Sequence, residues 1–154
     1  MGVLSHSVVE QYERAFWLLE RVVQAFNEEE WLADDGACEP PVRQALHAVE
    51  GMDFYLGVKP HGFQWGKRLG GEEDAEPPKP TQEELLTYAS EVLEKARGSL
   101  SSATDEAMRA LNTFPWSGAV VLDRHFYNLR HAHAHIGELN MLLRLKGKAI
   151  TDWR

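Results

Sequence analysis

Four of the seven histidines of this chain fall within eleven residues, at His125, His131, His133 and His135. On a helix, His131 and His135 lie about 40° apart and one turn above each other. That spacing lets two imidazoles bind one metal ion, and a third ligand from a neighbouring helix would complete an open site. His133 points about 160° to 200° away from both, so it cannot join them if this segment is helical.

The other histidines carry weaker signals. His47 lies in an earlier apolar segment, slightly off the apolar stripe of Val42, Leu46 and Val49. Periodicity alone therefore favours a partly buried histidine at the flank of a helix. His6, His61 and His125 have no partner at ligand spacing, and we expect them to be surface or hydrogen-bonded side chains.

Several polar residues share the face of His131 and His135. Arg124 lies about two turns earlier and is a candidate partner for a substrate carboxylate, or else a surface arginine paired with a helix acid. Asn128, one turn before His131, could orient a ligand. Glu138, and Glu50 in the earlier segment, are candidate bases. Other catalytic motifs are absent from the sequence, and Cys38 is expected to be a free structural thiol because it lies among acids.

Four long segments show helical periodicity, and no segment shows a convincing strand pattern. The chain should therefore be all-α, a single domain over 1–154 built as a four-helix bundle with a long connection between its second and third helices. Proline opens the second helix, and Thr81 with Glu84 forms a capping box at the third. The expected helices span 7–26, 41–57, 81–100 and 119–146, with a short one at 104–111 and the long connection at 58–80.

Composition excludes several classes of function. The net charge of −8 and the lack of a basic stripe argue against a nucleic-acid partner. No segment has the length of a membrane span, and the first residues do not read as a signal peptide. The single cysteine fits a reducing compartment, so we expect a cytoplasmic protein with no membrane partner.

At the level of motifs, the chain resembles the DinB-like, or YfiT-like, metal-binding four-helix bundles. That family places one ligand histidine in an apolar segment of the second helix, and Leu46-His47-Ala48-Val49 fits this pattern. It places two more on the last helix as H-x-x-x-H before a Gly-Gln/Glu-Leu stretch, and residues 131–139 fit. Many members carry Gln where this chain has Glu138. The insertion at 58–80 is a second departure, and it is placed to cover the site.

The resemblance implies a divalent metal held by His47, His131 and His135. Zn²⁺ and Ni²⁺ are the first candidates, and Fe²⁺ and Mn²⁺ are also compatible with imidazole ligands. It also implies a small-molecule substrate and a low-molecular-weight thiol, since several relatives are thiol-dependent S-transferases or related isomerases. One alternative is a non-catalytic metal-binding bundle that acts as a homodimeric structural or stress-response protein. A second alternative is a bundle without a metal, in which His131 and His135 are ordinary polar residues.

Overall fold

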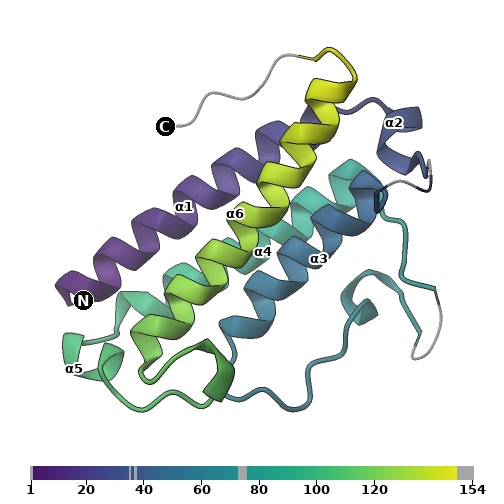
Figure 1. Ribbon diagram of the computed structural model, residues 1–154. Coiled ribbons are helices and arrows are strands. Elements are labelled where there is room, and N and C mark those ends of the chain that lie inside the picture. Colours follow the sequence, from purple (N-terminus) through teal and green to yellow (C-terminus); the bar gives the residue numbers. More distant parts are fainter. Residues whose placement is uncertain (1, 35, 37, 73–75, 149–154) are drawn as a thin grey trace.

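The computed structural model describes residues 2–34, 36, 38–72 and 76–148, and within these ranges it is all-α, as predicted (Figure 1). No strand is formed in these ranges, and the single β-bridge joins Leu111 to Val120. Residues 73–75 of the predicted connection lie outside the described residues. The elements are α1 (Val3–Gln24), α2 (Glu28–Leu32), α3 (Pro41–Tyr55), η1 (Lys67–Leu69), α4 (Gln82–Ser101), α5 (Asp105–Met108), η2 (Pro115–Ser117) and α6 (Val121–Leu145).

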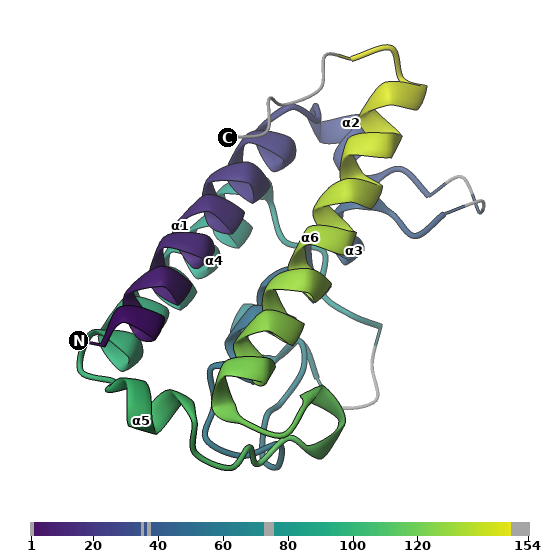
Figure 2. The same ribbon diagram turned by 60° about the vertical axis from the view of Figure 1, so that its left-hand side comes forward.

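The long helices α1, α3, α4 and α6 pack side by side (Figures 1 and 2). α1 packs chiefly against α4, and α3 packs chiefly against α6. At one end of the molecule the Gly2 N–H donates to the Ala103 carbonyl at 2.9 Å, and at the other end Gln82 Nε2 donates to the Phe26 carbonyl at 3.0 Å. These two contacts show that α1 and α4 run antiparallel.

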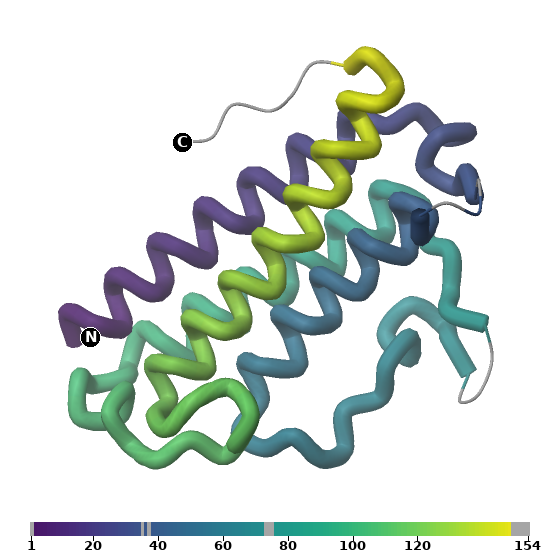
Figure 3. Tube along the Cα trace, in the orientation of Figure 1, coloured from purple at the N-terminus to yellow at the C-terminus, as the bar shows by residue number. Residues whose placement is uncertain are grey.

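α3 and α4 run in the same direction, so the chain between them must return along the length of both helices. The tube in Figure 3 shows this segment leaving the end of α3 and passing outside it towards the start of α4. Trp31 is buried, and it fixes the returning chain because its Nε1 donates to the Pro80 carbonyl at 2.8 Å. The long connection is therefore a requirement of the helix directions.

Local sequence explains most helix boundaries. The capping box at Thr81 and Glu84 is formed, and Pro41 occupies the first turn of α3 as predicted. α1 begins at Val3, four residues before the predicted start. The additional turn is stabilised from outside the helix, because Asp105 Oδ1 accepts a hydrogen bond from the Leu4 N–H at 2.8 Å. α2 was not expected, and it forms on a second capping box, between Asn27 and Glu30.

A polar network crosses the core between α1, α3 and α6. Tyr12 and Asn128 are fully buried, and His125 is 3% exposed. The Asn128 amide donates to the Tyr12 hydroxyl at 2.8 Å and to the Met52 carbonyl at 3.1 Å. The Tyr12 hydroxyl lies 3.1 Å from His125 Nδ1, and it donates a hydrogen bond to this nitrogen when the neutral ring carries its proton on Nε2. Burial, with a smaller contribution from Arg124, lowers the pKa of His125 to about 4.

This network predicts acid sensitivity. Because the pKa of His125 is about 4 in the fold and 6.5 without it, the unfolded chain binds the proton first as the pH falls. The free energy of unfolding should therefore drop between pH 6.5 and pH 4, by about 3 kcal/mol from His125 alone. Denaturant titrations of the metal-free protein at several pH values measure it. His125→Gln should show a shallower dependence, and an unchanged slope would contradict the assignment.

No helix among the described residues combines the length and the apolar character that a membrane span requires.

Candidate metal centre

Three histidines from two helices meet on one side of the molecule. His47 comes from the second turn of α3, and His131 and His135 come from consecutive turns of α6. One nitrogen from each ring lies within 4.8 Å of the corresponding nitrogens of the other two. The centroid of the His47 ring lies 5.1 Å from the centroid of the His131 ring and 5.0 Å from that of the His135 ring. The close packing of α3 on α6 thus brings residues 84 positions apart (131 − 47) together.

The donor set fits a divalent transition metal. His131 Nε2 and His135 Nε2 are 3.3 Å apart. Two nitrogens that bind one tetrahedral ion at about 2.0–2.1 Å are separated by about 3.3–3.4 Å, so this pair already has the required spacing. A neutral imidazole pair could instead share one hydrogen bond at this distance. Three imidazoles leave a fourth position for water or substrate.

His131 packs directly against the backbone of α3. A Cβ at Gly51 would lie 2.8 Å from His131 Cε1 and 2.9 Å from its Nδ1, so only glycine leaves room for the ring. Burial, with smaller contributions from His135 and His47, lowers the pKa of His131 to about 4. His131 is therefore neutral at pH 7, which is the form that binds a metal.

The orientation of His135 is set by Glu138 on the next turn. Glu138 Oε2 accepts a hydrogen bond from His135 Nδ1 at 2.9 Å, which leaves Nε2 free to face His131. Carboxylates commonly hold metal-binding histidines in this way. The structure thus places Glu138, a candidate base in the sequence, where it orients the His135 ring.

Removing this carboxylate should weaken metal binding without unfolding the protein. We expect Glu138→Ala to lower metal affinity roughly 10–100-fold, because the His135 ring loses its fixed orientation. Competition with a chromophoric chelator measures the affinity. Glu138→Gln keeps an acceptor oxygen and serves as the matched control. Equal losses in both variants would show that charge, rather than orientation, is what Glu138 supplies.

His47 is the most exposed of the three histidines. Trp65 stacks on its ring, with the centroids 5.6 Å apart and the planes 24° apart. The pKa of His47 is lowered, first by partial shielding of the ring from water and then by His135. Trp65 belongs to the long connection, and its contact with the candidate ligand His47 was not identified from the sequence.

Three other candidates from the sequence, His133, Asn128 and Arg124, are not part of the histidine cluster. His133 is half-buried and is not part of the cluster, as the helical spacing predicted. Asn128 does not hydrogen-bond to the cluster, because both of its amide hydrogen bonds hold α6 to α1 and α3 instead. Arg124 is only 9% exposed, so it is not a surface arginine. Its guanidinium carbon lies 5.0 Å from the centre of the Phe114 ring, and no described acid pairs with it.

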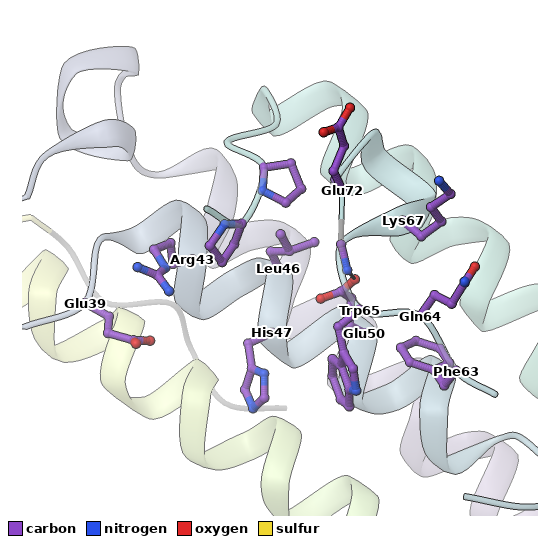
Figure 4. Close-up of a pocket in the computed structure, with 14 residues that line it drawn as sticks. Glu39, Arg43, Leu46, His47, Glu50, Phe63, Gln64, Trp65, Lys67 and Glu72 are labelled. Carbon is purple, nitrogen blue, oxygen red and sulfur yellow. Dashed lines mark hydrogen bonds between the residues drawn. The ribbon is translucent and has the colours of Figure 1, made fainter. Parts of the chain in front are cut away.

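A cavity of about 540 Å³ adjoins the histidines through His47 (Figure 4). One wall is α3, where Arg43, His47 and Glu50 follow one another on the same face. The opposite wall is the long connection, including Phe63 and Trp65. The connection therefore lines a space beside the candidate metal ligands. Glu50 holds part of the connection against α3, because it accepts a hydrogen bond from the Gly66 N–H.

No protein-family model matches the chain, and the comparison with curated proteins also finds no match.

Proposed function

We propose that the protein is a metal-dependent enzyme of the DinB-like type, which transfers a low-molecular-weight thiol to a small-molecule substrate or catalyses a related isomerisation. The observation that supports this proposal most strongly is the convergence of His47, His131 and His135 from two helices. Three neutral imidazoles favour a divalent transition metal, with Zn²⁺ or Ni²⁺ first and Fe²⁺ or Mn²⁺ also compatible.

A divalent ion in this position supplies the positive charge that lowers the pKa of a thiol and keeps it as a thiolate. Residues around the cluster would hold the three histidines in position for this ion. The Glu138 carboxylate fixes His135, Gly51 makes room for His131, and Trp65 packs on His47. The cavity beside His47 would hold the substrate and the body of the thiol. Arg124, the sequence candidate for pairing a substrate carboxylate, does not line this cavity, so no contact with the substrate is assigned to it.

The proposed architecture is a four-helix bundle in which α1 and α6 run opposite to α3 and α4. The hydrogen bonds at both ends of α1 and α4 and the packing of α3 on α6 support it.

We also propose a cytoplasmic homodimer without nucleic-acid or membrane partners. Phe126, Met141 and Leu145 on α6 are exposed and apolar, which supports a second copy as the partner. Sedimentation equilibrium tests the dimer.

The first test of this function is the metal content of untagged protein, followed by thiol binding. We expect about one equivalent of transition metal by elemental analysis, and then a thiolate-to-metal charge-transfer band when a thiol is added to the Co²⁺- or Ni²⁺-loaded protein. The fluorescence of Trp65 gives a second signal, because its ring stacks on His47. A protein that takes up no metal after reconstitution would overturn the proposal.

The same experiment separates the two functional classes. One equivalent of metal with a thiol band supports the transferase or isomerase. One equivalent of metal that no thiol perturbs favours the non-catalytic metal-binding bundle.

A further inference from the structure

Glu50 is a buried carboxylate in the wall of the cavity beside His47. It is 5% exposed, and it lies three residues after His47 on α3, so the two side chains are neighbours on one face of the helix. Burying an ionised carboxylate is costly unless a cation or several hydrogen bonds compensate it. The surroundings of Glu50 therefore indicate what a ligand in the cavity must provide.

The chain compensates this carboxylate only in part. Oε1 accepts a hydrogen bond from the Gly66 N–H, whereas no other hydrogen bond or ion pair to Glu50 forms among the described residues. Burial raises the pKa of Glu50, the Gly66 N–H lowers it, and Asp53, which is also an acid, raises it further. A carboxylate can accept about four hydrogen bonds, so most of this capacity remains for a ligand.

The aromatic and acidic side chains that line the cavity around Glu50 favour the binding of a cation. The Phe63 and Trp65 rings lie with their centroids 4.9 Å apart and line the same cavity. Aromatic faces attract ammonium groups, and they do so more strongly where water is excluded. Five charged residues line the cavity, three of them acids, so the lining carries a formal charge of −1: Glu39, Arg43, Glu50, Lys67 and Glu72.

We infer that the cavity binds the protonated amine of an aminothiol, with the ammonium group at Glu50 and the sulfur towards His47. This inference rests on the proposed function, because it places the thiol of that reaction beside the metal ligands. The spacing supports it, because neighbouring side chains at i and i+3 on a helix have Cβ atoms about 5–6 Å apart. An extended two-carbon aminothiol separates its sulfur from its nitrogen by about 4 Å, and a hydrogen bond of about 2.8 Å reaches from the nitrogen to a carboxylate oxygen. Selectivity for the thiol would then come from α3 and the long connection.

Two thiols of nearly equal size test the inference. Cysteamine carries an ammonium group where 2-mercaptoethanol carries a hydroxyl. Their affinities for the Co²⁺-loaded protein are measured from the charge-transfer band, in the parent and in Glu50→Gln. The glutamine keeps an oxygen that accepts from the Gly66 N–H, so the cavity wall is retained while the charge is lost. Glu72→Gln, on the same cavity, removes a charge from an exposed side chain and is the matched control.

We expect the preference for cysteamine over 2-mercaptoethanol to fall about tenfold in Glu50→Gln and to stay unchanged in Glu72→Gln. Each thiol has the same intrinsic acidity with every variant, so only the change in this ratio reports on Glu50. Equal weakening of both thiols would overturn the inference and leave the thiol-binding function standing. An equal fall in both variants would assign the effect to the general charge of the cavity and would also overturn it. The absence of a band with either thiol in the metal-loaded parent would overturn the inference together with the proposed function.

Discussion

Alanine at position 47, 131 or 135 should strip the stoichiometric metal from the purified protein, whereas His133→Ala should retain it. The three affected rings are the ones whose nitrogens lie within 4.8 Å of one another. Loss of a group that merely orients a ligand costs roughly 10–100-fold in affinity, so loss of a ligand should cost more. Elemental analysis of untagged protein after gel filtration measures the outcome directly.

His133 is a demanding control because it lies between the candidate ligands His131 and His135 on the same helix. A general effect of histidine content on metal uptake would lower the metal content of His133→Ala as well. Chelation adds an independent signal, since a ligand bound only by the folded state raises stability by about 4 kcal/mol at a thousand times its dissociation constant. A chelator should therefore lower the melting temperature of the parent and leave that of His131→Ala unchanged. Metal retained by His47→Ala would show that the third ligand is misassigned.

Gly51→Ala should weaken metal binding by at least tenfold while the helices stay folded. The new methyl group would lie less than 3 Å from two atoms of the His131 ring, and the ring is the part free to move. A ring displaced from α3 can no longer present Nε2 at 3.3 Å from His135 Nε2. Alanine also favours a helix interior over glycine by up to about 1 kcal/mol, so α3 itself should not be weakened.

Two other helical glycines provide matched controls for this variant. Gly98 on α4 and Gly137 on α6 have open space where a Cβ would be added. Gly137→Ala is the closer control, because it lies two residues from His135. We expect both controls to bind metal like the parent, with affinity measured by chelator competition and helix content by far-ultraviolet circular dichroism. Normal metal affinity in Gly51→Ala would show that His131 does not depend on its contact with α3.

The sequence predicted most of the fold because its signals were local. Apolar periodicity, a capping box and helix-opening prolines are properties of neighbouring residues, and they located four long helices to within a few residues. The start of α1 was wrong by four residues because its first turn depends on Asp105, which no local pattern links to Leu4. α2 was missed, although Asn27 and Glu30 carry the capping-box spacing.

The candidate site was predictable to a different degree for each residue. His131 and His135 follow from spacing on one helix, and His133 is excluded by the same spacing. His47 came only from the family resemblance, since a contact between α3 and α6 has no local signal. Gly51 could have been identified from the sequence, because a glycine inside an apolar helix often marks a place where another element packs closely on the helix backbone. Arg124 was assigned to the correct face of the helix, but its burial against Phe114 could not be read from helix geometry.

The returning chain between α3 and α4 contributes no described member of the histidine cluster, yet it forms one wall of the adjoining cavity. It is held to the helices at separate points, by Glu50 at Gly66, by the Arg68–Glu91 ion pair and by Trp31 at Pro80. Selection can therefore act on the returning chain and on the histidine cluster independently. Substitutions in the returning chain can change which small molecule is accepted while the histidines and the helix packing stay constant. Under the proposed function, the returning chain would therefore set ligand preference and the histidines would set the metal chemistry.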